Sequence, residues 1–219
     1  MALAIDWPVI EMAVPLLAQG TLVTLQISIS AILLGTLGGV LLGVLSLSSW
    51  PLARLFVRAY VDFIRGTPLL VQIFLVFFAL PVLGIRLSET WSGIAALSIN
   101  CAGYVAEIVR GTVGSVEQGQ SEAAKSIGMT RLQIIHRILL PQAFRPIIPP
   151  LTNELISLVK NSSLLSVIAV YELTRSGQAI IATYFAPFEI YALIALYYYV
   201  IVSVLAFLSR LVERRLPVW

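Results

Sequence analysis

The chain has 219 residues, of which 59% are hydrophobic and only 11% are charged, with a mean hydropathy of +0.96. Soluble domains carry roughly 25% charged residues, so this composition excludes a soluble globular protein and indicates an integral membrane protein. The single cysteine, Cys101, excludes a disulfide framework and a cysteine metal site. A membrane span needs about 20 apolar residues, and the chain has room for five.

The first apolar segment runs without a charge from Met12 to Ala53. No proline or loop cluster divides its centre, so we expect one long tilted span over residues 16–47, with residues 1–15 as an interfacial lead-in. Small polar residues share one helical face, which predicts contact with protein on that side: Thr21, Thr24 and Ser28. Three glycines spaced by four predict close approach of another helix: Gly35, Gly39 and Gly43.

The second and third spans are expected over residues 61–82 and 91–109. Pro68 predicts a kink in the second span, where Asp62 and Arg65 lie three residues apart and can pair. Asn100 lies near the centre of the third span, where a polar side chain is costly unless it faces a partner or a cavity. An interhelical hydrogen bond and a place in a cavity are both open for it. Glu107 and Arg110 predict an ion pair at the cytoplasmic edge.

The longest polar interruption of the chain is Ser121–Pro141, within a loop over residues 111–141. Ser121 is expected to cap a first short helix, and Gly128 suits the left-handed position that ends it. Thr130 and Gln133 have the spacing of a capping box that begins a second helix, and Pro141 predicts a change of course. From these residues alone, an interfacial amphipathic loop helix is an equally good interpretation.

The fourth span, expected over residues 151–170, is unusually polar. Glu154, Ser157 and Asn161 recur on one helical face, whereas Lys160 projects about 100° away from Asn161. An ionisable residue within a membrane segment indicates a functional site, and broken helices line cavities in transporters. The alternative is that Glu154 and Lys160 pair or extend toward the interface. A short helix over residues 178–184 is expected across the outer mouth, followed by a fifth span over residues 188–208.

The distribution of basic residues sets the orientation. Most of the lysines and arginines fall in the segments that this layout places inside, and only Arg86 and Arg175 fall outside. The positive-inside rule therefore predicts an all-α integral membrane protein with five transmembrane helices, the N-terminus outside and the C-terminus inside.

Three motifs resemble a known family. Glu122-Ala123-Ala124, Gly128 and Ile138-x-Leu140-Pro141 resemble the signature loop of ABC importer permeases. The runs 65–72 and 160–164 resemble the polar amino acid permeases of the histidine, arginine and glutamine group. The resemblance implies a single transmembrane domain over residues 1–219, of the type I ABC importer fold, in a bacterial inner membrane. Its loop implies a cytoplasmic coupling helix that docks on a separate ATPase through Glu122, Ala123, Ala124, Gly128, Leu140 and Pro141.

The resemblance also implies partners and a pocket. The partners are two ATP-binding cassette subunits, a second permease subunit (identical or not), an extracytoplasmic amino acid-binding protein and membrane lipid. The chain carries no Walker A motif, so we expect no enzymatic activity of its own, no catalytic or metal-binding residue, and ATP and Mg bound by the partner subunits. The implied substrate pocket for a polar or basic L-amino acid consists of Leu69, Leu70, Asn100, Glu154, Ser157 and Asn161.

One pocket position departs from the family pattern, which commonly has aspartate where this chain has Asn161. The neutral amide weakens the case for a strictly cationic substrate, whereas Glu154 favours one. Two other classes of function stay open. An ion-coupled secondary transporter or channel would work without an ATPase, and a non-transporting scaffold subunit would have no convergent polar cavity.

Overall fold

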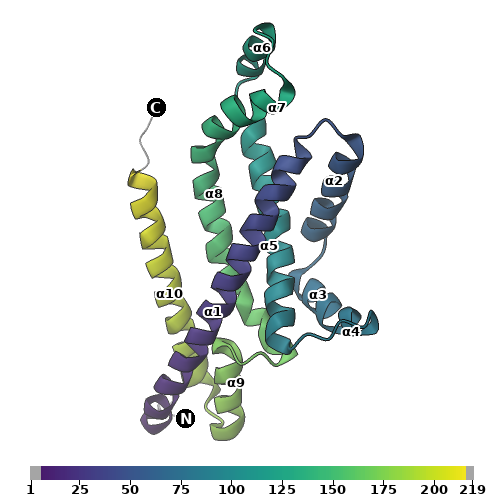
Figure 1. Cartoon of the computed structure of the whole chain (residues 1–219). Coiled ribbons are helices and arrows are strands. Elements are labelled where there is room, and N and C mark those ends of the chain that lie inside the picture. Colours follow the sequence, from purple (N-terminus) through teal and green to yellow (C-terminus); the bar gives the residue numbers. More distant parts are fainter. Residues whose placement is uncertain (1–5, 216–219) are drawn as a thin grey trace.

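The longest helix, α1 (Trp7–Ser46), crosses the face of the molecule seen in Figure 1. The computed structural model describes residues 6–215 (side chains to 214), and α1 begins at Trp7 because Asp6 caps it: the Asp6 side chain accepts a hydrogen bond of 3.3 Å from the Val9 amide. Residues 7–15 are therefore part of the helix rather than a separate lead-in. The rest of the expected lead-in, residues 1–5, lies outside the described residues.

Helix α1 packs closely against α5 (Glu89–Gly114) through its glycines. A Cβ added at Gly39 would lie only 2.5 Å from the Cβ of Val105, and one added at Gly43 only 2.6 Å from the Cβ of Val109. Thr24 is fully buried and accepts a hydrogen bond of 3.0 Å from the Leu173 amide. The close helix approach and the protein-facing polar side of this segment are both confirmed.

The second expected span is not one helix. Helix α2 (Pro51–Gly66) and the following segment, α3 (Leu69–Phe74), π-helical η1 (Leu75–Ala79) and α4 (Leu80–Val82), meet at an angle of 111°. Thr67 is extended, with φ −121° and ψ 144°, because the proline that follows disfavours the helical conformation at this residue. The expected kink at Pro68 is thus a sharp break, after which α3 still packs against α5 while α4 points away from the bundle (Figure 1).

The polar loop forms a projecting end of the molecule (Figure 1). Helix α6 (Gln118–Ser126) has Glu117 at its cap position, so the expected cap at Ser121 is wrong and Ser121 lies inside the helix. Gly128 has a φ of +80°, as its left-handed position requires. Thr130 and Gln133 form the predicted capping box at the start of α7 (Arg131–Ile134).

Beyond α7 the chain stays helical through the prolines. A π-helical turn, η2 (Ile135–Leu139), leads into α8 (Leu140–Asn161), which contains Pro146, Pro149 and Pro150. Pro141 directly follows the π-helical turn η2, and the chain stays helical through it, so the predicted change of course at this residue is wrong. A 3₁₀ segment, η3 (Ser162–Ile168), then breaks the α-helical run.

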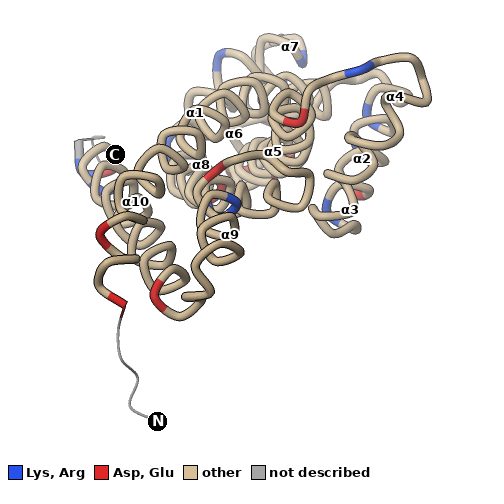
Figure 2. The backbone as a smooth tube through the Cα atoms, turned by 90° about the horizontal axis from the view of Figure 1, so that it is seen from below, with Lys and Arg blue, Asp and Glu red and all other residues tan. Residues whose placement is uncertain are grey.

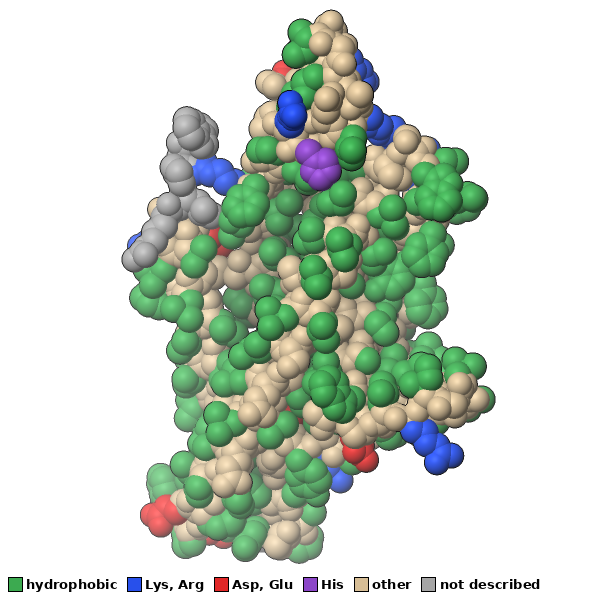
Figure 3. Space-filling view, in the orientation of Figure 1, with side chains coloured by type: hydrophobic (Ala, Val, Ile, Leu, Met, Phe, Trp, Pro, Cys, Tyr) green, Lys and Arg blue, Asp and Glu red, His purple; other side chains and the backbone are tan. Residues whose placement is uncertain are grey.

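The chain closes with α9 (Leu173–Tyr184) and α10 (Pro187–Arg215). Within the described residues, α1, α5 and α10 are long and apolar enough to cross a membrane, and the count rises to five if each bent pair, α2 with α3–α4 and α7–η3 with α9, is one span. Charged positions are sparse along the backbone (Figure 2). Hydrophobic side chains cover the middle of the visible face, and Lys and Arg gather toward the α6–α7 end (Figure 3).

Candidate functional site

The six predicted pocket residues lie on three helices. Leu69 and Leu70 begin α3, Asn100 is in the middle of α5, and Glu154, Ser157 and Asn161 follow one face of α8. Helix α5 packs against both α3 and α8, so it joins the other two groups. Asn100 is buried, and the other five side chains are half-buried.

Asn100 makes an interhelical hydrogen bond. Its amide nitrogen donates to Oε1 of Gln72 over 2.9 Å, and both side chains are buried. Of the two interpretations of this residue, the interhelical bond is therefore present. One of the two N–H groups of the amide is used in this bond, which leaves the second N–H and the carbonyl oxygen of Asn100 for a ligand.

Gln72 is a residue whose role the sequence analysis missed. Its amide nitrogen donates to the carbonyl oxygens of Ile64 (2.8 Å) and Thr67 (3.1 Å) and to the Thr67 hydroxyl (2.9 Å). The carbonyls at the end of α2 have lost their helical donors, and an apolar surrounding makes unsatisfied ones costly. Gln72 thus provides donors for the free carbonyl oxygens at the break between α2 and α3, and its bond with Asn100 joins the break to α5. A lone glutamine in an apolar run was the available signal.

The polar face of α8 is arranged differently. Glu154 is half-buried and, among the described residues, belongs to neither of the ion pairs formed. Lys160 is exposed on another side of the helix, so the alternative of a Glu154–Lys160 pair is not present. A carboxylate within a membrane helix has to face water, a ligand or another protein chain. This face of α8 is available for such a contact.

The role of another glutamate, Glu172, was also missed by the sequence analysis. It lies just after α8 and η3. Glu172 is fully buried at the N-cap of α9. Its carboxylate accepts hydrogen bonds from the Arg175 amide (2.8 Å), the Thr174 amide (2.9 Å) and the Tyr198 hydroxyl (3.0 Å). These bonds join α9 to α10. Glu172 is therefore a structural residue, and no ligand is needed to explain it.

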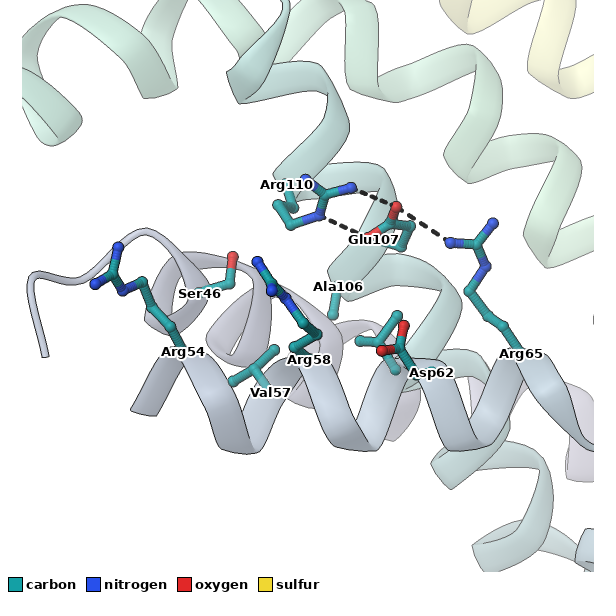
Figure 4. Close-up of a pocket in the computed structure, with 10 residues that line it drawn as sticks. Ser46, Arg54, Val57, Arg58, Asp62, Arg65, Ala106, Glu107 and Arg110 are labelled. Carbon is teal, nitrogen blue, oxygen red and sulfur yellow. Dashed lines mark hydrogen bonds and ion pairs between the residues drawn. The ribbon is translucent and has the colours of Figure 1, made fainter. Parts of the chain in front are cut away.

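Along α2, charged side chains from α2 and α5 face one another (Figure 4). Glu107 pairs with Arg110 through two bonds of 2.6 and 2.7 Å, which confirms the predicted pair. Arg65 pairs with Glu107 over 3.1 Å rather than with Asp62. The predicted Asp62–Arg65 pair is wrong because the neighbouring helix offers Arg65 a carboxylate already held in place by Arg110.

The predicted coupling residues lie at the projecting α6–α7 end and at the start of α8 (Figure 1). Glu122, Ala123, Gly128 and Pro141 are exposed, Leu140 is half-buried and Ala124 is buried. A cavity of about 360 Å³ lies beside them, lined in part by Ser121, Lys125 and Arg131. This end therefore presents an exposed helix, small side chains and basic groups, as a docking surface for another protein requires.

Comparison with known proteins fits this geometry. Residues 31–218 match the family model described as "Binding-protein-dependent transport system inner membrane component". The chain belongs to this family. Because its members are inner membrane transport components, this permease is an inner-membrane protein whose role is transport rather than catalysis.

Individual relatives place the permease among amino acid transporters. It is 39% identical to the glutamine transport system permease protein GlnP of Escherichia coli (strain K12), covering 97% of this chain and 98% of the relative. It is 34% identical to the arginine transport system permease protein ArtQ of Bacillus subtilis (strain 168), covering 93% of each.

Solved structures agree on the architecture. The permease matches a chain of an amino acid ABC transporter crystallised with histidines, with a TM-score of 0.90 and 36% identity over 98% of this chain and 100% of the other. It matches the MetNI methionine ABC transporter with a TM-score of 0.79 at 22% identity, over 93% of this chain and 97% of the other. The second match supports the fold alone. The permease therefore has the type I ABC importer permease fold.

Proposed function

We propose that this permease forms, together with a second permease chain, the translocation path of an ATP-driven importer for a polar or basic L-amino acid. The observation that carries the proposal is the polar face of α8, where the half-buried Glu154 belongs to no ion pair among the described residues. Exposure of this face to lipid would be costly. A second permease chain, with a water-filled path between the two chains, would shield this face of α8 from lipid.

The chemistry of the pocket suits an amino acid. Glu154 meets an ammonium or guanidinium group, and Asn161 hydrogen-bonds an amide or a carboxylate. Leu69 and Leu70 pack against an aliphatic stem. Asn100 contributes its carbonyl oxygen and its second N–H, because only one N–H of its amide is held by Gln72. The relatives named for glutamine and arginine, and the structure solved with histidines, are consistent with a substrate of this class.

In this proposal, ATP binding and hydrolysis by the partner subunits are coupled to transport through the α6–α7 end. In the proposed complex, two ATPase subunits bind ATP and Mg and close on each other, and each receives an α6–α7 segment through Glu122, Ala123 and Gly128. Ala124 is buried, so it packs the segment rather than touching the partner. Closure of the ATPases favours one of two orientations of the permease pair, which is a shift between states. An extracytoplasmic binding protein delivers the amino acid to the outward-open state.

The proposal is tested by the ATPase activity of the complex reconstituted with its binding protein. Arginine, lysine, histidine and glutamine are compared in the wild type, in Glu154→Gln and in the matched control Glu89→Gln, whose glutamate is exposed at the start of α5. We expect stimulation by cationic amino acids to fall about tenfold or more in Glu154→Gln, because a charge-assisted bond to the substrate is lost, and to be unchanged in Glu89→Gln.

The outcomes separate the classes of function. Stimulation by glutamine that is equal in wild type and Glu154→Gln would keep the importer and remove Glu154 as the specificity residue. Uptake that needs an ion gradient but no ATPase would instead indicate a secondary transporter or channel. If no amino acid stimulated the ATPase activity, with competent ATPase and binding protein present, the chain would instead be a non-transporting scaffold subunit.

A further inference from the structure

A cavity of about 230 Å³ lies between α2 and α5, beside the last residue of α1, Ser46 (Figure 4). Its charged lining residues are Arg54, Arg58, Asp62, Arg65, Glu107 and Arg110. Four arginines therefore face two carboxylates, which leaves an excess of two positive charges. None of these residues belongs to the predicted amino acid pocket, and the proposed transport mechanism gives the cavity no role.

The ion pairs in the cavity leave two of the arginines without a partner. Glu107 is shared by Arg65 and Arg110. Among the described residues, neither Arg54 nor Arg58 takes part in the ion pairs formed. These two lie four residues apart on α2, where like charges destabilise a helix. An oxyanion held between them would relieve this repulsion and accept paired hydrogen bonds from the planar guanidinium groups.

The position of the cavity indicates where such an anion would come from. Ser46 ends the long apolar helix α1, so the cavity lies at the level where α1 leaves the membrane core and lipid headgroups begin. Helix α2 also carries large exposed apolar side chains beside the arginines: Leu52, Leu55 and Phe56. A headgroup in the cavity would leave its acyl chains able to cover this apolar surface.

We propose that this cavity binds the phosphate of an anionic phospholipid, with phosphatidylglycerol as the simplest example. Arg54 and Arg58 hold the phosphate, while the Glu107 pairs keep Arg65 and Arg110 in place around it. Basic pockets between membrane helices on the cytoplasmic side are suited to anionic headgroups. Asp62 adds selectivity, because its carboxylate can accept a hydrogen bond from a glycerol hydroxyl but repels a doubly charged free phosphate. A bound lipid would join α2 to α5 and the end of α1.

The test is the thermal unfolding midpoint of the purified complex in detergent, titrated with dioleoylphosphatidylglycerol, dioleoylphosphatidylcholine or sodium phosphate. A ligand that binds the folded state raises this midpoint saturably. We expect saturable stabilisation by phosphatidylglycerol alone. Its apparent affinity should fall about fivefold for each arginine removed in Arg54→Gln and Arg58→Gln, since an arginine near a lipid surface contributes about that factor. The conservative Arg58→Lys keeps the charge and should retain most of the affinity.

Arg86→Gln is the matched control, because Arg86 is an exposed arginine in the connection between α4 and α5, away from the cavity. It should bind phosphatidylglycerol like the wild type. Equal stabilisation by phosphatidylcholine, or unchanged affinity in Arg54→Gln and Arg58→Gln, would overturn the site. If sodium phosphate raised the unfolding midpoint as saturably as phosphatidylglycerol does, the ligand would be a free anion and the lipid assignment would be overturned. A loss of the second permease copy in Arg58→Gln, seen as a lower mass of the complex, would show an interface between copies instead.

Discussion

Two glutamates on successive helical segments, Glu154 in α8 and Glu172 before α9, have opposite environments. Glu172 is fully buried and accepts three hydrogen bonds from two backbone amides and a tyrosine hydroxyl. Glu154 is half-buried and is absent from the ion pairs among the described residues. Buried polar groups in folded proteins are almost always satisfied. A satisfied carboxylate therefore belongs to the architecture, whereas an unsatisfied one at partial burial indicates a missing ligand or partner.

The largest effect is expected from Glu172→Ala. The change leaves the Thr174 and Arg175 amides without their acceptor in a part-buried place, and each orphaned group costs about 1–3 kcal/mol. The Tyr198 hydroxyl also loses this acceptor but keeps the Thr174 hydroxyl at 3.3 Å. We expect the free energy of unfolding to fall by about 3 kcal/mol, measured by denaturant unfolding in detergent. The control is Glu117→Ala, since Glu117 is also at an N-cap but its side chain makes no capping bond. Equal losses in the two variants would mean that the buried network of Glu172 adds no stability.

An intermediate effect is expected from Gln72→Ala, because Gln72 is a satisfied polar group that also supports the proposed pocket. The variant leaves the Asn100 amide and the carbonyl oxygen of Ile64 unpaired. We expect a loss of about 1–2 kcal/mol of stability and a rise in the KM for transport, because Leu69 and Leu70 directly follow the break that Gln72 holds.

The loss of stability and the rise in KM expected for Gln72→Ala are measured separately, by unfolding and by uptake kinetics in the same preparation. Gln142→Ala serves as the control, since Gln142 is exposed on α8. A fall in stability with an unchanged KM would show that the break between α2 and α3 does not position the pocket. An unchanged stability would show that water replaces Gln72 at the ends of the helices.

The difference between the two glutamates also explains how far the sequence could predict this molecule. The polar face of Glu154, Ser157 and Asn161 depends only on helical spacing, and it was predictable. The role of Glu172 depends on Tyr198, which α10 brings to it from later in the chain, so local sequence contained no sign of it.

The breaks between helices show the same limit. Pro68 predicts a kink, but the helices meet at 111°. The break is held by Gln72, which bonds the end of α2 and also Asn100 of α5, and the bond to Asn100 requires the folded chain. Conversely, Pro146, Pro149 and Pro150 lie inside α8 without ending it, because packing against neighbouring helices can compensate for the lost backbone bonds. The cap at Ser121 was wrong because Gln118, Gly119 and Gln120 extend the helix backwards, although glycine is a poor helix former.

The smallest effect on stability is expected from Glu154→Gln, and it is the most informative comparison with Glu172→Ala. Removing the charge from a half-buried carboxylate that has no ion-pair partner should change the free energy of unfolding by less than about 0.5 kcal/mol, as for ordinary substitutions away from a network. Arginine added in 10-fold increments should raise the free energy of unfolding of the wild-type complex. The increase should be smaller for Glu154→Gln. A large loss of stability without ligand would mean that Glu154 already has a partner within the assembled protein. In that case it would belong with Glu172 among the structural carboxylates, and the polar face of α8 would no longer support a substrate pocket.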